Sequence, residues 1–285
     1  MTAEPTQPDN PAWSDQDLSE NPHENADKAT RVQKMFSAIA PSYDINNRVH
    51  SLWRDQAWRR AAVKMAELTP GDEVVDVACG TGDLTLAFAE SLKGVNKPES
   101  ISVGQVRGID FTYEMLPIAR EKSRSHVWPS VIGKAPSGKF GSPRRLSEAV
   151  PFLQGDAMNL PLPDACCDVV SIAFGIRNVA KPEKAMAEFY RILKPGGRLI
   201  VLEFSLPKNP LLLAGYNVYF KHIMPRTATL IAGDKSGAYK YLPKSVNTFI
   251  DREGMQSMMA DAGFEDLKHK ALTFGIAVCY RGIKK

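Results

Sequence analysis

Cysteine is scarce in this sequence, and no metal-binding pattern accompanies it. The four cysteines form no C-x-x-C pair and no regular spacing, which predicts a reduced, intracellular protein. The five histidines show neither an H-E-x-x-H pattern nor a His/Cys cluster, so we expect no metal site. No uninterrupted apolar run reaches the length of about eighteen residues that a membrane-spanning helix requires.

The N-terminal segment has few aliphatic side chains. Residues 1–30 contain four prolines and seven acidic residues against a single lysine. Such a segment buries too little apolar surface to offset the entropy of ordering it, so residues 1–30 are predicted to be a disordered acidic tail. The segment lacks the apolar stretch of a secretory signal and is too acidic for a mitochondrial transit peptide, which favours a cytoplasmic protein.

Further along the chain, buried strands alternate with helices. Strands are predicted at 73–78, 103–109, 150–153, 167–174 and 198–204. This alternation is typical of a doubly wound, mostly parallel α/β sheet. Two more β-like segments, 264–271 and 275–283, are joined too closely to run parallel to one another. The sequence therefore predicts a Rossmann-like, seven-stranded sheet with one antiparallel strand.

Three segments depart from this alternation within a single domain of residues 31–285. Residues 31–68 are predicted to form an N-terminal helical cap. Residues 123–149 are basic and rich in Ser, Gly and Pro, which indicates an insertion loop. Residues 206–247 combine an apolar run with basic residues and are predicted to form a helical lid over the carboxyl edge of the sheet.

A glycine turn follows the first predicted strand. Asp76 lies in the strand, and Gly80-Thr81-Gly82 leads into a helix, so a ligand can approach the backbone and the helix N-terminus closely. The dinucleotide pattern G-x-G-x-x-G would need glycine where Thr85 stands. The carboxylates of Asp76 and Asp83 disfavour a pyrophosphate and suit the positively charged methionine end of S-adenosylmethionine.

Polar residues also follow the next predicted strands. Asp110 ends the second strand, where a carboxylate can bond ribose hydroxyls, and Asp156-Ala157 follows the third, within reach of an adenine amino group. Arg177-Asn178 follows the fourth strand. Arg177 is a candidate to stabilise a developing phenolate, and Asn178 to orient a hydroxyl. A purely structural role is the competing interpretation for Asp110 and for Arg177.

Several segments resemble the ubiquinone/menaquinone-biosynthesis C-methyltransferase family, which includes demethylmenaquinone methyltransferase. The resemblance runs from about Val32 to the C-terminus. The segments that carry it are F-S-A-I-A-P-S-Y-D at 36–44, F-G-I-R-N-V at 174–179, L-E-F-S at 202–205 and Y-L-P-K-S-V at 241–246. The glycine turn and the K-P-G-G turn at 194–197 are shared by many methyltransferases and are less specific.

The resemblance implies a class I S-adenosylmethionine-dependent methyltransferase. The substrate that it implies is a prenylated quinol, either demethylmenaquinol or 2-methoxy-6-polyprenyl-1,4-benzoquinol. It implies cofactor contacts at Thr81, Asp110 and Asp156-Ala157, and we expect Tyr43 to close over the methionine end. A further family contact, a serine before F-G-I-R-N, is Ala173 here.

The implied substrate also bears on partners. Because a prenyl tail is very apolar, we expect transient, peripheral contact with the inner membrane surface through residues 211–220 and the basic residues Lys208, Lys221 and Arg226. Lys and Arg are otherwise scattered outside 134–145, so no nucleic-acid partner is expected. The sequence leaves open whether the protein forms a homodimer.

Three alternatives stay open on the sequence alone. A methyltransferase acting on another small or lipid-like molecule would share every cofactor residue. A non-catalytic scaffold would retain the fold, although the intact glycine turn and Asp110 argue against it. A nucleic-acid methyltransferase is favoured only by the basic insertion.

Overall fold

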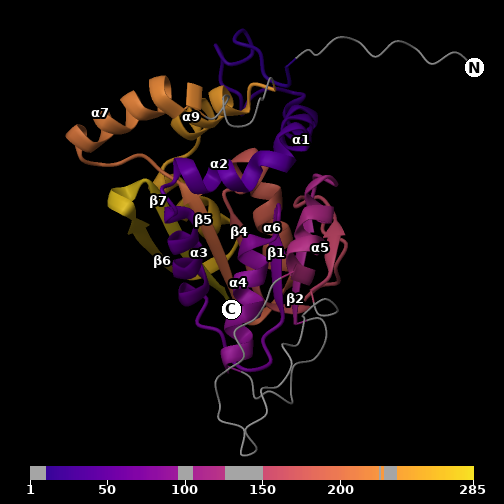
Figure 1. The fold of residues 1–285 in the computed structure, drawn as a ribbon. Helices are drawn as coiled ribbons and strands as arrows, with labels where there is room; N and C mark the ends of the chain where they lie inside the picture. Colours follow the sequence, from indigo (N-terminus) through magenta and orange to yellow (C-terminus); the bar gives the residue numbers. More distant parts are fainter. Residues whose placement is uncertain (1–10, 96–104, 126–149, 225, 228–235) are drawn as a thin grey trace, which may run out of the picture.

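The structure is a computed structural model that describes residues 11–95, 105–125, 150–224, 226–227 and 236–285 (Figure 1). Its centre is a seven-stranded sheet of order β3-β2-β1-β4-β5-β7-β6. The strands are β1 (Val74–Val77), β2 (Val106–Asp110), β3 (Phe152–Gln154), β4 (Cys167–Ala173), β5 (Leu193–Phe204), β6 (Phe264–Leu272) and β7 (Ala277–Lys284). β7 pairs antiparallel with both β5 and β6, so in this sheet it alone runs opposite to the other six strands. The predicted fold class is confirmed, including the single reversed strand.

Helices cover both faces of the sheet. One apolar cluster joins α3 (Arg54–Met65) and α4 (Asp83–Val95) to strand residues that include Val74. The opposite cluster joins α6 (Pro182–Ile192) and α10 (Arg252–Asp261) to strand residues that include Val75 and Val77. Successive strand residues point to opposite faces, and both faces are covered, so the strands are continuously apolar in sequence. α5 (Met115–Ser125) packs against Phe152 of β3.

A second helical layer lies over the carboxyl ends of the parallel strands (Figure 1). From the N-terminal side it contains α1 (Lys28–Ile39), a 3-10 turn η1 (Ala40–Ser42) and α2 (Tyr43–His50). From the segment expected to form a lid it contains α7 (Pro210–Val218), the π-helical turn η3 (Tyr219–Ile223) and α9 (Ala238–Thr248). An apolar cluster joins α1, α9 and Met224, so the two parts of this layer pack on each other.

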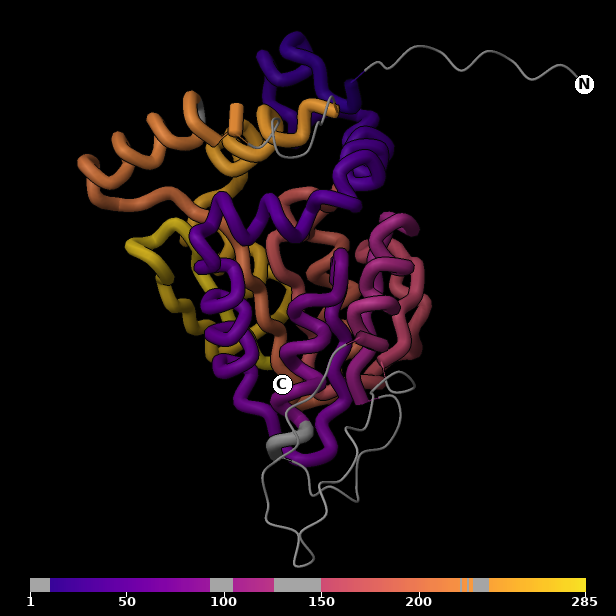
Figure 2. The backbone as a smooth tube through the Cα atoms, viewed as in Figure 1, coloured from indigo at the N-terminus to yellow at the C-terminus, as the bar shows by residue number. Residues whose placement is uncertain are grey.

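The expectation of a disordered tail is wrong for residues 11–30. Trp13 is 1% exposed and stacks on Tyr241 of α9, with 4.8 Å between the ring centroids, and Figure 2 shows this early segment beside α9. The average composition of residues 1–30 does not reveal the contribution of one large aromatic side chain, that of Trp13. Its burial stabilises the segment. Local hydrogen bonds, such as those between Ser14 and Asp17, satisfy its polar groups. Residues 1–10 lie outside the described residues.

The basic insertion expected at 123–149 also begins later than predicted. Residues 123–125 are the last residues of α5, because its apolar face continues through Ser123, which is buried. Residues 126–149 lie outside the described residues.

The packing of α6 generates a stability prediction. Phe189 is fully buried in the cluster between α6 and the sheet. Phe189→Ala should therefore lower the free energy of unfolding by about 3–5 kcal/mol, measured by urea unfolding. Lys184→Ala, on the exposed side of the same helix, should stay within about 0.5 kcal/mol of the parent. A loss of less than about 1 kcal/mol for Phe189→Ala would contradict this packing.

Candidate active site

Two neighbouring cavities lie between the carboxyl edge of the sheet and the helical layer above it. The smaller has a volume of about 100 Å³, and the larger of about 550 Å³. Phe36, Tyr43 and Phe174 line both of them, so aromatic side chains alone separate the two spaces at this point. A molecule in one cavity can thus lie next to a molecule in the other.

Five of the residues expected to bind a cofactor line the smaller cavity, namely Tyr43, Gly80, Asp110, Asp156 and Ala157. They come from α2 and from the ends of β1, β2 and β3. Ala173, where the implied serine is missing, lines it as well. The parallel strands therefore bring these separate sequence positions to one crevice, as the strand-end argument predicts.

Asp110 organises this cavity. One carboxylate oxygen accepts a hydrogen bond from the backbone N–H of Gly80 at 2.7 Å, and the other accepts one from the N–H of Thr112 at 2.8 Å. Burial raises the pKa of Asp110 to about 6, although these two hydrogen bonds and a third from the side chain of Thr112 favour its charged form. A carboxylate offers about four acceptor positions, so acceptor capacity remains. Asp110 can therefore hold the glycine turn in place and still accept the hydroxyl groups of a ribose.

Asp76, Thr81 and Gly82 do not line the smaller cavity. Asp76 is buried beneath the turn, where its two oxygens accept hydrogen bonds of 2.6 Å from Thr85 and Ser171. Burial raises the pKa of Asp76 to about 6 despite these bonds. The Thr81 hydroxyl donates to Asp44 at 2.7 Å. In the structure these residues support the glycine turn from outside the smaller cavity. Direct contact between them and the cofactor stays a prediction.

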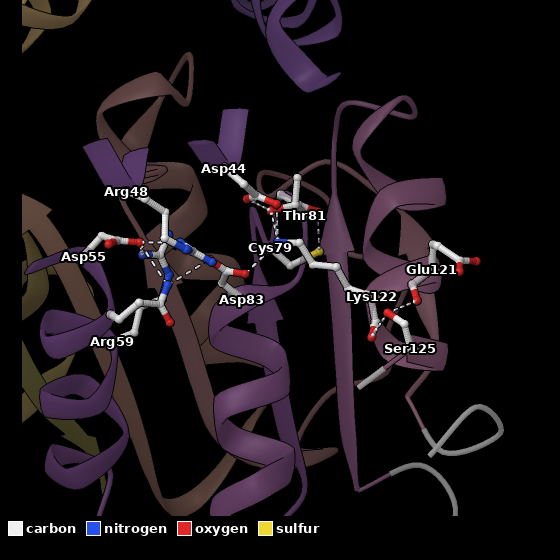
Figure 3. A network of polar contacts seen from close by, with 12 residues as sticks. Asp44, Arg48, Asp55, Arg59, Cys79, Thr81, Asp83, Glu121, Lys122 and Ser125 are labelled. Carbon is white, nitrogen blue, oxygen red and sulfur yellow. Dashed lines mark hydrogen bonds and ion pairs between the residues drawn. The ribbon is translucent and has the colours of Figure 1, made fainter. Parts of the chain in front are cut away.

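An ion-pair network ties the helical cap to the glycine turn (Figure 3). Lys122 of α5 lies 2.6 Å from both Asp44 of α2 and Asp83 at the start of α4. Arg48 of α2 also pairs with Asp83, at 3.0 Å. Burial alone would raise the pKa of Asp83, but these cations, chiefly Lys122, hold it well below its usual range. The sequence analysis missed this network, because its members are far apart in the chain and share no spacing.

The larger cavity is mostly aromatic and aliphatic, with Arg177 in its wall. Nη1 of Arg177 lies 2.6 Å from Oε1 of Glu203 and donates to the carbonyl of Phe174 at 2.8 Å. Both members of this pair are buried, and the guanidinium lies over the ring of Phe204 at 5.2 Å from its centroid. Nε of Arg177 has no hydrogen-bond partner among the described residues. This nitrogen is enclosed by the protein, so a donor to an oxygen in the cavity must be another N–H of the guanidinium.

Glu203 is a site residue to which the sequence analysis gave no role. It stands in the L-E-F-S segment of strand β5, directly after the apolar run L-I-V-L at 199–202. A carboxylate buried in such a strand needs a cationic or hydrogen-bonding partner, and this signal was present in the sequence.

Asn178 and Arg177 line different cavities. It lines the smaller cavity, and its Nδ2 donates to the carbonyl of Phe174 at 3.2 Å. Its Oδ1 accepts a hydrogen bond of 3.0 Å from the hydroxyl of Tyr241, which lines the larger cavity. Burial raises the pKa of Tyr241 to about 12, so the phenol stays protonated and donates. Asn178 and Tyr241 together bridge the two cavities.

Among the described residues there is no group of three or more His, Cys, Asp or Glu side chains placed to hold a metal ion. No helix in the described ranges is long and apolar enough to cross a bilayer.

The strand order and the strand-end crevice together define an S-adenosylmethionine-dependent methyltransferase fold. An S-adenosylmethionine-dependent methyltransferase of Thermotoga maritima, titled a possible histamine N-methyltransferase, matches 89% of this chain and 100% of its own, with a TM-score of 0.55 and 24% identity. The [4+2]-cyclase SpnF matches at a TM-score of 0.53 and 19% identity, over 80% of each chain. The fold alone therefore does not fix the reaction.

Sequence comparison fixes the family. Residues 24–284 match the model of the ubiE/COQ5 methyltransferase family. Demethylmenaquinone methyltransferases of Deinococcus radiodurans and Thermus thermophilus are 40% and 42% identical, covering 91% and 87% of this chain and 95% and 99% of theirs. The ubiquinone/menaquinone biosynthesis C-methyltransferase UbiE of Geobacter sulfurreducens is 40% identical over 90% of each chain. The chain belongs to the ubiE/COQ5 methyltransferase family, as the resemblance predicted, and its cofactor is S-adenosylmethionine.

The position of Asp110 predicts how cofactor binding depends on pH. Protonation below about pH 6 removes the charge and lowers the acceptor capacity of a carboxylate that lines the cavity. The affinity for S-adenosylmethionine, measured by calorimetry, should therefore fall as the pH is lowered through about 6. Asp110→Asn should weaken binding at pH 8 by about tenfold or more and flatten this dependence.

Asp76→Asn is the matched control, because Asp76 has a similarly raised pKa but lies away from the cavity. The pH dependence should persist in this variant. If it disappeared there and persisted in Asp110→Asn, the assignment of the titration to Asp110 would be wrong.

Proposed function

We propose that this enzyme methylates a ring carbon of a prenylated quinol, with demethylmenaquinol as the first candidate and 2-methoxy-6-polyprenyl-1,4-benzoquinol as the second. The observation that carries this proposal is the larger cavity. It is mostly apolar and aromatic, and it adjoins the smaller cavity at Phe36, Tyr43 and Phe174. Two buried guanidinium groups line it, that of Arg177 and that of Arg59, which pairs with Asp55. A quinol ring with an apolar tail matches that combination, and the names of the relatives point to the same substrates.

The residues of the smaller cavity fit the cofactor of the family. Asp110 has free acceptor positions for ribose hydroxyls, and Gly80 exposes backbone without a side chain between it and the ligand. Asp156, whose Oδ1 accepts from the N–H of Met158 at 2.9 Å, is oriented along the same wall. Bound S-adenosylmethionine supplies a methyl group on a sulfonium, which leaves as a neutral thioether. Tyr43 and Phe174 then exclude water from the boundary between the cavities.

The chain's contribution to the acceptor side is alignment and electrostatics. A quinol carbon becomes nucleophilic as its hydroxyl gives its proton to water, so a donor near that oxygen stabilises the developing charge. Once the carbon–carbon bond has formed and the carbon–sulfur bond has broken, the methylated ring carbon releases its hydrogen to water as a proton and the ring becomes aromatic again. An arginine side chain is too basic to act as a general base. The donor that we assign to the quinol oxygen is a guanidinium N–H of Arg177 that contacts neither Phe174 nor Glu203. Glu203 compensates the buried charge of Arg177 and fixes its orientation through the 2.6 Å contact.

Arg177 generates a direct activity prediction. Methyl transfer from labelled S-adenosylmethionine is measured on reduced demethylmenaquinol and benzoquinol analogues. Arg177→Ala and Arg177→Lys should each lower kcat by about a hundredfold or more, because lysine lacks the planar set of donors that reaches Phe174, Glu203 and the quinol together. Arg191→Lys, in an ion pair on α6 away from both cavities, is the matched control and should change kcat less than about twofold.

Two outcomes would contradict the proposal in different ways. Near-parental turnover in Arg177→Ala would remove Arg177 from the reaction. No turnover of either quinol by a parent enzyme that still binds S-adenosylmethionine would redirect the acceptor to another small or lipid-like molecule.

We also propose that the mouth of the larger cavity contacts the membrane surface. Leu52, Trp53, Leu211 and Phe274, which we call the apolar rim, are 62–81% exposed. Leu52 and Phe274 also line the larger cavity, so the rim borders its opening. The membrane contact surface expected at 211–220 is thus extended to the loops that contain Leu52-Trp53 and Phe274. Within 211–220 itself, Tyr216 is buried. Lipid contact there would place the opening where a prenylated quinol is dissolved.

The backbone supports a functional role for the rim. Leu52, Trp53 and Phe274 have φ values of 50°, 60° and 57°, in the left-handed region that bulky side chains rarely adopt. Such a conformation costs free energy and persists where the surrounding structure enforces it, often at ligand-binding sites. Here it turns large apolar side chains outward.

Charging the rim should separate membrane contact from chemistry. Trp53→Glu and Leu211→Glu should each weaken binding to anionic phospholipid vesicles, measured by sedimentation, by about tenfold, because each removes an apolar side chain from the lipid interface. Activity on a short-tailed, water-soluble quinol should stay at the parental level. Leu153→Glu, at an exposed apolar residue of the edge strand β3, is the control. Unchanged vesicle binding and unchanged activity on a long-tailed quinol would overturn the proposal.

A further inference from the structure

The N-terminal strap, which we define as residues 11–23, precedes residue 24, where the match to the family model begins. It nevertheless packs on the helical layer above the cavities. Trp13 contacts Tyr241 as a stacked pair with an interplanar angle of 23°. Tyr241 lines the larger cavity and is itself 1% exposed, so Trp13 forms its outer support.

The backbone of the strap is fitted closely to the turn before α9. The N–H of Trp13 donates to the carbonyl of Ser236 at 3.1 Å. Gly237 has a φ of +85°, and a Cβ there would lie 2.2 Å from the carbonyl oxygen of Trp13. Glycine at 237 is therefore required for this approach. The position of the Trp13 backbone is thus fixed relative to α9.

Side chains of α1 hold the other side of the strap. Arg31 donates to the carbonyl of Ala12 at 3.0 Å, pairs with Asp17 at 2.9 Å and lies 5.6 Å from the centroid of the Trp13 ring. The indole is consequently enclosed between α1 and α9. Its Nε1 has no hydrogen-bond partner among the described residues, so ring contacts, and not the indole N–H, hold it in place.

From Trp13 a continuous set of contacts leads to the site. The hydroxyl of Tyr241 donates to Asn178 at 3.0 Å, and Asn178 donates to the carbonyl of Phe174 at 3.2 Å. That carbonyl also accepts from Arg177. If the indole were removed, the ring of Tyr241 would gain space on its outer face and could rotate away from Asn178. Asn178 would then lose the partner that fixes its amide against the smaller cavity.

We propose that Trp13 is a positioning residue for the cofactor site, acting through Tyr241 on Asn178. This proposal rests on the assignment of the smaller cavity to S-adenosylmethionine, and it extends the proposed function with a residue outside the matched family region. A merely structural tryptophan would contribute stability without altering the affinity of the folded protein for its cofactor.

The test is a double-mutant cycle read by cofactor affinity. The dissociation constant of S-adenosylmethionine is measured by calorimetry for the full-length parent, Trp13→Ala, Tyr241→Phe and the double variant, at a temperature well below each Tm. Trp13→Ala and Tyr241→Phe should each raise the dissociation constant about fivefold, and the double variant no further, because both break the same link. Trp13→Phe, which keeps a stacking ring and removes the unpaired N–H, should stay within about twofold of the parent.

Asp15→Ala is the control within the strap, since Asp15 is exposed and, within the part of the chain that the structure describes, forms its ion pair with the surface residue Lys240. It should leave the dissociation constant within about twofold of the parent. An unchanged dissociation constant in Trp13→Ala, or effects of Trp13→Ala and Tyr241→Phe that multiply in the double variant, would overturn the proposal. Because the cycle uses no quinol, it remains decisive even if the parent fails to methylate either quinol, which would count against the proposed function alone.

Discussion

The site depends on one carbonyl group, that of Phe174. It accepts hydrogen bonds from both Arg177 and Asn178. Arg177 lines the larger cavity, and Asn178 lines the smaller one. Phe174 has a φ of 56°, and its ring lines both cavities. A Cβ on Gly175 would lie 2.6 Å from that of Ala78, so this loop rests directly on the chain that leaves β1. One strained turn thus fixes Arg177 in the wall of the larger cavity and Asn178 in the wall of the smaller one. It also fixes the boundary between the two cavities.

Charge in the site is compensated in two separate ways. On the cofactor side, Asp110 and Asp76 are held by hydrogen bonds from Gly80, Thr112, Thr85 and Ser171, and burial leaves both of them easier to protonate than ordinary carboxyls. On the acceptor side, Arg177 is paired with Glu203. Under the proposed function, an S-adenosylmethionine cation would lie beside the carboxylates that line the smaller cavity, and a quinol oxygen beside the guanidinium of Arg177. This division suits transfer from a sulfonium to an electron-rich ring.

Much of this arrangement could be predicted from the sequence, and the remainder follows from contacts between distant residues. The alternation of strands and helices, and the rule that carboxyl ends of parallel strands share an edge, correctly brought Gly80, Asp110 and Asp156 to one cavity. Position along a strand does not reveal which neighbours a side chain meets, so the enclosure of Asp76 by Thr85 and Ser171 was not foreseen. Lys122 and Trp13 have partners far away in sequence, and no local pattern marks such pairs. The apolar run before Glu203 indicated that its carboxylate needs a partner, but not that the partner is Arg177. The averaged composition of residues 1–30 concealed Trp13 in particular.

The central claim is that a quinol carbon receives the methyl group in the larger cavity. The most direct test is ¹³C nuclear magnetic resonance of the product formed from reduced demethylmenaquinol and S-adenosylmethionine labelled at its methyl carbon. The account predicts a single labelled signal at the shift of an aromatic ring methyl. A labelled signal at the shift of a methoxy group, or no transfer to the quinol, would contradict it.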